Sequence, residues 1–276
     1  MKTPMLIVAL ITLLGCGVCV GKDTCFECHL VMEGMSLKFT NDIHCVKGIS
    51  CANCHGGDPN ESDQNISMNA SRGFKVRPTH KQIPELCGSC HSDTNFMSKY
   101  EAQPRVDQLA RYKTSVHWKL LADGNRRAAE CVDCHGVHNT RAVSDPLSTA
   151  SPGRISKTCG KCHRSTAEAF ADTDHGELFV TRRRPGCTVC HSNHDIQPAT
   201  TAMLTGPNSV CARCHRPGSR QIRLAENMAK VLTDLEAAGP GSKDALERAR
   251  VAVHSMDLDA VKRAAASPSQ SESDEK

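Results

Sequence analysis

The chain has 276 residues, a formal net charge of +4 and an aromatic content of only 3%. So mild a charge, without a basic block, does not indicate nucleic-acid binding. One Trp, two Tyr and six Phe are few for a core of this size, whereas 17 cysteines and 14 histidines are many. A group other than aromatic side chains must therefore fill the interior.

Residues 1–21 read as an export signal. Lys2 precedes an apolar stretch over residues 5–14, which has the length of a signal-peptide core. The run Leu13-Leu14-Gly15-Cys16 resembles the lipobox of bacterial lipoproteins, in which the cysteine is lipidated. The alternatives are ordinary cleavage and retention of the uncharged segment 4–21 as an anchor. All three interpretations place the rest of the chain outside the cytoplasm, in the periplasm. If Cys16 is lipidated, the lipid would attach the protein to a membrane.

The sequence C-x-x-C-H occurs seven times and is the attachment signature of c-type haem. Two thiols about one helical turn apart add to the haem vinyl groups, and the adjacent imidazole becomes the proximal ligand of the iron. The copies are Cys25-Cys28-His29, Cys51-Cys54-His55, Cys87-Cys90-His91, Cys131-Cys134-His135, Cys159-Cys162-His163, Cys187-Cys190-His191 and Cys211-Cys214-His215.

Other interpretations of a C-x-x-C pair do not explain the histidine. Zinc sites, disulfides and redox dithiols all use this cysteine spacing, but none requires His after each second Cys. The sequence therefore predicts seven covalently attached haem c groups with their iron. Three cysteines remain, of which Cys16 is the lipidation candidate. A disulfide between Cys19 and Cys45 is one alternative for the other two.

Seven histidines lie outside the motifs, which equals the number of predicted irons. They are His44, His80, His117, His138, His175, His194 and His254. If each supplies a second axial ligand, every iron is held between two imidazoles and has no open position for a substrate. We therefore predict an electron carrier without a substrate site of its own.

Recurring positions support four of these histidines as ligands. His138 and His194 each lie three residues after a proximal histidine. His117 and His175 occupy equivalent places ahead of the fourth and sixth motifs. The identical offset of His138 and His194 in separate segments is not expected of histidines that lie on the surface without a role.

The other three spare histidines have positional support of a different kind. His44 and His80 each precede the first cysteine of a motif by seven residues. His254 belongs to an apolar stripe at helical spacing, so it is expected to face inward. Met32 and Met35 are rival ligands for the first iron, since methionine is also an axial ligand of haem.

An internal repeat organises the segment 22–216, which we predict to be the cytochrome domain. Each copy contains a spare histidine, then C-x-x-C-H followed by Gly or Ser, and then a second C-x-x-C-H. The copies begin at His44, His117 and His175. Intervening segments are short and rich in turn-forming residues, and no strand pattern is present. We expect mainly short α-helices and irregular loops around a haem-packed core, with little β structure.

Residues 217–265 are predicted to form a C-terminal helical hairpin. Ile222, Met228, Leu232 and Leu235 share one face of an amphipathic helix. Residues 239–241, Gly-Pro-Gly, break this helix, and a second one begins near residue 242. The polar, acidic segment 266–276 is expected to be a disordered tail.

Three stretches resemble the bacterial multihaem c-type cytochromes, including the tetrahaem and quinol-dehydrogenase types of anaerobic metal- and sulfur-respiring bacteria. They are CANCHGGDP at 51–59, YKTSVH at 112–117 and CVDCHGVH at 131–138. The resemblance implies closely spaced bis-histidine haems and electron transfer in anaerobic respiration. It also implies redox protein partners, such as a membrane quinol dehydrogenase or another multihaem cytochrome.

The alternative is a multihaem oxidoreductase that acts on a small nitrogen or sulfur compound at one open haem. Nitrite reductases of this general plan typically carry C-x-x-C-K at the active haem, a motif that does not occur here. Hydroxylamine oxidoreductases use a tyrosine cross-linked to the haem. Tyr100 and Tyr112 are the available tyrosines, and neither lies in a supporting motif.

Overall fold

The computed structural model describes residues 23–32, 38–182, 186–206 and 208–267, and these form helices, turns and loops without a strand. The expected fold of short helices and irregular connections is confirmed. The predicted signal segment, Cys16, Cys19, Met35 and residues 268–276 of the predicted tail lie outside the described residues. Cys45 is disulfide-bonded.

The chain forms two compact units. Unit 1 comprises the described residues from 23 to 77 together with 138–140, and unit 2 comprises those from 78 to 137 and from 141 to 267. The predicted cytochrome domain 22–216 is therefore divided between two units. The C-terminal helices, expected to stand apart, belong to the same unit as five of the seven motifs.

The described residues of unit 1 form four short α-helices and a 3-10 turn. They are α1 (Thr24–Val31), α3 (Ile43–Val46), α4 (Cys51–His55), α5 (Gln64–Ser67) and η1 (Ala70–Arg72). Asp23, Asp42 and Asp63 cap α1, α3 and α5, because each side chain accepts a hydrogen bond from a first-turn backbone N–H. Among the described residues of this unit, the buried hydrophobic cluster consists of Phe26 and Cys45. Capping and covalent attachments must hold this unit, because burial is slight.

Gly57 lies where the backbone after α4 approaches another turn of unit 1. Its φ is +85°, and an added Cβ would lie 2.3 Å from the carbonyl oxygen of Ser67. Gly48 has the same φ but nothing within 4 Å of its Cβ position. We expect Gly48→Ala to cost about 1 kcal/mol through backbone strain alone, and Gly57→Ala about 3 kcal/mol or more. Urea unfolding of the haem-loaded protein measures both, and equal costs would contradict the proposed close approach.

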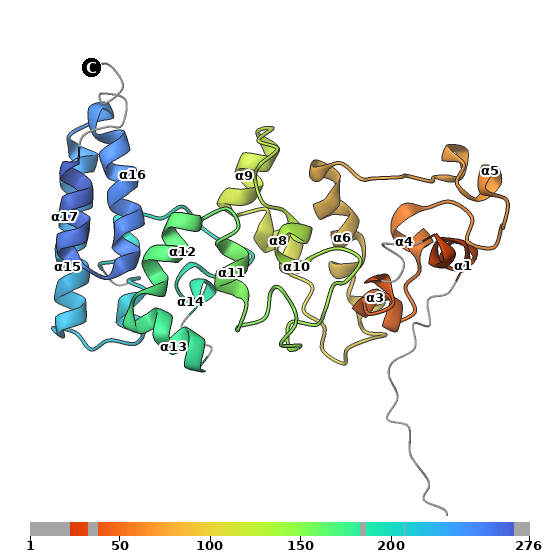
Figure 1. The fold of residues 1–276 in the computed structure, drawn as a ribbon, viewed down its shortest axis with the longest axis horizontal. Helices are drawn as coiled ribbons and strands as arrows, with labels where there is room; N and C mark the ends of the chain where they lie inside the picture. The colour runs from red at the N-terminus through yellow and green to blue at the C-terminus, as the bar shows by residue number, and fades with distance from the viewer. Residues whose placement is uncertain (1–22, 33–37, 183–185, 207, 268–276) are drawn as a thin grey trace, which may run out of the picture. The chain divides into compact units, whose positions relative to one another are not determined.

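Unit 2 contains the remaining haem-motif helices and the segments between them. Its α-helices before residue 200 are α6 (Ile83–His91), α7 (Thr94–Met97), α8 (Gln108–Tyr112), α9 (Val116–Ala122), α10 (Cys131–His135), α11 (Ile155–Cys159), α12 (Arg164–Ala171), α13 (Asp174–Arg182) and α14 (Cys187–His191). The 3-10 helices are η2 (His80–Gln82), η3 (Thr201–Met203) and η4 (Cys211–Arg213). Within this unit α6, α10, α11 and α14 follow one another in sequence order (Figure 1).

Three helices rather than two form the C-terminal region. They are α15 (Arg220–Ala237), α16 (Lys243–Ala252) and α17 (Leu258–Ala266), with η5 (Pro240–Ser242) and η6 (Val253–Ser255) between them. The predicted second helix stops because Met256 adopts the left-handed conformation, and Asp257 then caps α17. Met228, Leu232, Ala249, Val253 and Val261 form the core of the three helices. Among the described helices, none has both the length and the apolar character needed to span a membrane.

Candidate haem-binding site

Helical turns position the motif cysteines, except that Cys162 and Cys214 lie just beyond the ends of α11 and η4. In α4, α10 and α14 the helix consists of only the five residues C-x-x-C-H. Residues three and four apart share one face of a helix, so both thiols and the imidazole project to the same side. None of the 14 motif cysteines is part of a disulfide, as covalent attachment of haem requires.

The residue after these three helices explains the Gly or Ser of the repeat. Gly56, Gly136 and Ser192 all have positive φ and an extended ψ, a combination that is strained for any residue except glycine. The conformation ends the helix directly after the proximal histidine. Ser192 tolerates it because its hydroxyl donates a hydrogen bond to Asp195 and accepts one from Arg111.

Five spare histidines face five proximal histidines. The ring centroids are 5.9–6.3 Å apart in every pair. The pairs are His55–His138, His117–His163, His135–His194, His175–His215 and His191–His254. The first pair belongs to unit 1 and the other four to unit 2.

This separation fits a haem iron between the two rings. An iron with a nitrogen about 2 Å away on each side, and ring centroids about 1 Å behind those nitrogens, requires centroids about 6 Å apart. All five pairs therefore have the spacing of two axial ligands of one iron.

The pairing follows a rule along the sequence. His138 and His194, each three residues after a proximal histidine, face the iron position two motifs earlier. His117 and His175 face the second motif that follows them. His254, far beyond the last motif, returns to the sixth motif from η6. The repeat was visible in the sequence, but the pairing within it was not.

Hydrogen bonds to Nδ1 orient several of the imidazoles. His55 Nδ1 lies 2.9 Å from the carbonyl oxygen of Lys75, and His254 Nδ1 lies 3.1 Å from that of Arg250. His44 Nδ1 is 2.8 Å from a carboxylate oxygen of Asp42. When Nδ1 donates to such an oxygen, Nε2 is left as the metal-binding nitrogen. Sequence reasoning missed Asp42, which no motif marks.

Burial favours the neutral form of seven of the ten paired histidines, which is the form that binds a metal. Desolvation lowers their pKa, and in most pairs the facing histidine lowers it further. The histidines whose pKa is lowered by burial are His117, His135, His138, His175, His191, His194 and His254.

Two predicted spare histidines are placed differently. His44 is fixed by Asp42 at the start of α3 in unit 1. His80 lies in η2 beside Glu130 and Asp133, and its ring faces no proximal histidine among the described residues. The five facing pairs involve the proximal histidines of five motifs, and His29 and His91 belong to the other two motifs. Met32, the rival ligand, ends α1 and is exposed.

Asp195 and Arg111 hold the loop that presents His194. The Arg111 guanidinium donates a 2.8 Å hydrogen bond to Asp195, and Ser192 donates a second. These two bonds lower the pKa of the Asp195 carboxyl to about 2. We expect Asp195→Asn to loosen His194, so that carbon monoxide displaces it from one reduced haem about tenfold more readily.

Asp145→Asn provides the control for this prediction, because Asp145 pairs with Arg141 in a loop without a haem ligand. Carbon monoxide titration of the dithionite-reduced protein, followed in the Soret band, measures the effect. Equal responses in the two variants would show that Asp195 does not position His194.

The motif helices of unit 2 contact one another in sequence order. Helix α6 packs against α10, α10 against α11, and α11 against α14. Thr149 joins two of these neighbours, since its hydroxyl donates to the Cys134 carbonyl oxygen at 2.6 Å while its own carbonyl accepts from Thr158 at 2.7 Å. Arg213 in the seventh motif donates to the carbonyl oxygen of Val189 in the sixth at 3.2 Å. Successive attachment points in this unit are therefore adjacent.

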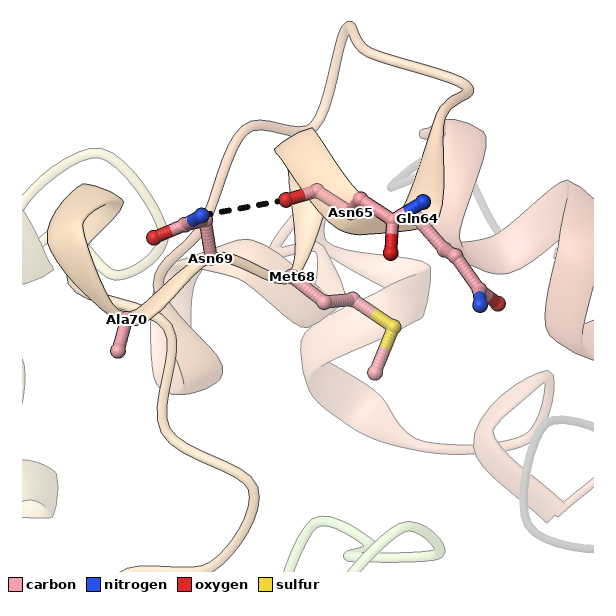
Figure 2. A pocket seen from close by; sticks show the side chains of 5 residues that line it. All are labelled: Gln64, Asn65, Met68, Asn69 and Ala70. Atoms are coloured by element: carbon pink, nitrogen blue, oxygen red, sulfur yellow. Dashed lines mark hydrogen bonds between the residues drawn. The ribbon is translucent and has the colours of Figure 1, made fainter.

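A hollow beside α5 is not a further haem site. It is lined by Gln64, Asn65, Met68, Asn69 and Ala70 (Figure 2). The Asn69 side-chain amide donates to the Asn65 carbonyl oxygen at 3.2 Å across it. The lining includes neither cysteine nor histidine, so it offers no thiol for attachment and no imidazole for iron.

Comparison with known proteins agrees with this geometry. Residues 43–150 match the cytochrome c3 family, and residues 158–236 match the family of cytochrome c554 and c-prime. The chain is 23% identical over 225 residues to the C-type polyheme cytochrome OmcC of Geobacter sulfurreducens, an alignment that covers 69% of this chain. The chain spans 28% of the length of that relative. No solved structure matches.

The attachment motifs and the facing histidines define a protein that binds haem through cysteine and histidine. The chain belongs to the multihaem c-type cytochromes. Proteins of this class carry covalently bound haem c, exchange electrons with redox partners and are typically extracytoplasmic.

Proposed function

We propose that this cytochrome carries seven haems and transfers electrons through irons held mainly between two histidines. The observation that carries the proposal is the set of five facing histidine pairs, each with centroids about 6 Å apart. Bound haem supplies reversible one-electron chemistry at its iron. The paired imidazoles leave no coordination position for a substrate, which favours a carrier over an enzyme.

We further propose that electrons in unit 2 pass along the motifs in the order third to seventh, or the reverse. Adjacent motif helices support this order, because each attachment point lies next to its neighbour in the sequence. The first and second motifs are likewise neighbours within unit 1, where α1 contacts α4. The rate of electron transfer falls steeply with distance, so electrons pass between the haems whose attachment points are neighbours.

The cellular setting is proposed from the sequence and the relatives. We place the mature protein in the periplasm, with lipidated Cys16 as a membrane attachment, in anaerobic respiration. Partners would be a membrane quinol dehydrogenase or another multihaem cytochrome. Docking between electron carriers is expected to be weak and brief, and steered by charge around exposed haem edges.

One observation favours a second candidate function. His80 faces no proximal ring, so the spare histidines that remain are one fewer than the predicted irons. An iron without a second imidazole could bind a small nitrogen or sulfur compound. The chain would then be an oxidoreductase with one active haem fed by the others.

Mass spectrometry of the mature protein, combined with electron paramagnetic resonance and a redox titration, tests both functions. The carrier predicts seven haem masses, mostly low-spin signals, and rapid reduction without turnover of nitrite or hydroxylamine. Turnover of either compound at a high-spin haem would favour the enzyme. A mass equal to the bare polypeptide, with no Soret band, would refute both.

A further inference from the structure

A second type of metal ligand set lies beside the fourth haem motif. His80 is the first residue of η2, Glu130 is the N-cap of α10, and Asp133 follows within that helix. Each offers one ligand atom, and these atoms all lie within 4.8 Å of one another. All three residues belong to unit 2.

The cluster contains buried polar atoms without hydrogen-bond partners. Glu130 is only 2% exposed, and its Oε1 is buried and accepts no hydrogen bond. His80 Nδ1 is also buried and has no partner. Leaving two such atoms unsatisfied is costly, so a ligand that contacts both is expected.

Backbone hydrogen bonds hold the two carboxylates in place. Glu130 Oε2 accepts from the N–H of Val132 at 2.9 Å, and Asp133 Oδ2 accepts from the N–H of Glu130 at 2.9 Å. Each carboxylate therefore keeps an oxygen available while its orientation is fixed. An ion that lies about 2.1 Å from each ligand atom holds these nitrogen and oxygen atoms about 3–4 Å apart. This separation is longer than the donor–acceptor distance of a good hydrogen bond.

His80 is poorly placed to share an iron with the motif that follows it. It precedes His91 by 11 residues along the consecutive helices η2 and α6. At 1.5 Å per residue this is about 16 Å, whereas two axial ligands of one iron need ring centroids about 6 Å apart.

We propose that His80, Glu130 and Asp133 bind one divalent cation of the zinc type, separate from the haem irons. One imidazole and two carboxylates suit Zn²⁺ and its first-row neighbours. Two carboxylate charges balance the charge of the ion, so that burial of Glu130 no longer leaves an uncompensated anion. The ion would fix η2 against α10 next to the fourth haem.

Isothermal titration of the haem-loaded protein with zinc chloride, combined with elemental analysis, tests the site. Haem-ligated histidines cannot bind zinc, so the background is low. We expect one zinc per chain, and at least tenfold weaker binding in both His80→Ala and Glu130→Gln. Glu130→Gln keeps an oxygen for the Val132 N–H while it removes the charge. Glu85→Gln, an exposed carboxylate of α6 paired with Lys113, is the control and should bind zinc as the unaltered protein does.

The haem spectrum of His80→Ala separates this site from haem ligation. A zinc site predicts an unchanged count of low-spin haems in His80→Ala. Conversion of one haem to high spin would show that His80 is an axial ligand and would overturn the proposal. Zinc binding that is absent, or equally strong in all variants, would also overturn it. In neither case does the haem electron-transfer function fail.

Discussion

Replacing His254 with alanine should convert one haem from low spin to high spin. Its ring centroid lies 5.9 Å from that of His191, and its Nδ1 is 3.1 Å from the Arg250 carbonyl oxygen, which leaves Nε2 for the iron. Loss of this imidazole opens the sixth coordination position and raises the reduction potential of the haem at Cys187 and Cys190. Electron paramagnetic resonance and a redox titration measure the two changes.

Chemical rescue makes this experiment specific. Free imidazole should enter the vacated space in His254→Ala and restore the low-spin signal. Ser255→Ala is the neighbouring control, because that hydroxyl donates only to the Ala252 carbonyl oxygen and should leave every haem low-spin. If His254→Ala retains the full low-spin count, then the C-terminal helices merely cover the sixth haem and the pairing with His191 is wrong.

The sequence predicted which residues bind haem better than it predicted which two histidines share an iron. The C-x-x-C-H motif encodes its own geometry, since one helical turn places both thiols and the proximal imidazole together. The second ligand comes from a distant segment, as His138 does for His55. Nothing local distinguishes one iron from another for such a side chain, so the sequence could count ligands but could not pair them.

The break in the C-terminal helix and the hydrogen bonds that support the histidines could not be predicted from the sequence. The helix expected over residues 242–265 is divided because Met256 is left-handed, a conformation for which methionine has no preference. Asp42 and Asp195 support His44 and His194 through hydrogen bonds that no spacing rule marks. His80 shared its offset before a motif with His44, yet it lies beside Glu130 and Asp133. The same distance between a histidine and a motif therefore predicted the same role only where the surrounding sequence repeat was also the same.

The haem-free chain should show no cooperative thermal transition. In unit 1 the buried hydrophobic cluster is limited to Phe26 and Cys45, with Phe39 and Cys51 partly buried against it. Burying one large apolar side chain contributes about 2–3 kcal/mol, whereas ordering each residue costs about 1–2 kcal/mol in backbone entropy alone. Haem faces and iron–imidazole bonds must supply the missing stabilisation, so cofactor binding is part of folding.

The C-terminal helices are the part of the chain in which ordinary burial is most extensive. Met228, Leu232, Ala249, Val253 and Val261 pack together there, and Ala249 and Val261 are fully buried. In haem-free protein, made by expression without an export signal or attachment machinery, we expect residual helix confined to α15, α16 and α17. Circular dichroism with hydrogen exchange measures this, and the haem-loaded protein is the reference. A cooperative transition in the haem-free chain, or amide protection across α4, α10 and α14, would show that the polypeptide alone specifies the fold.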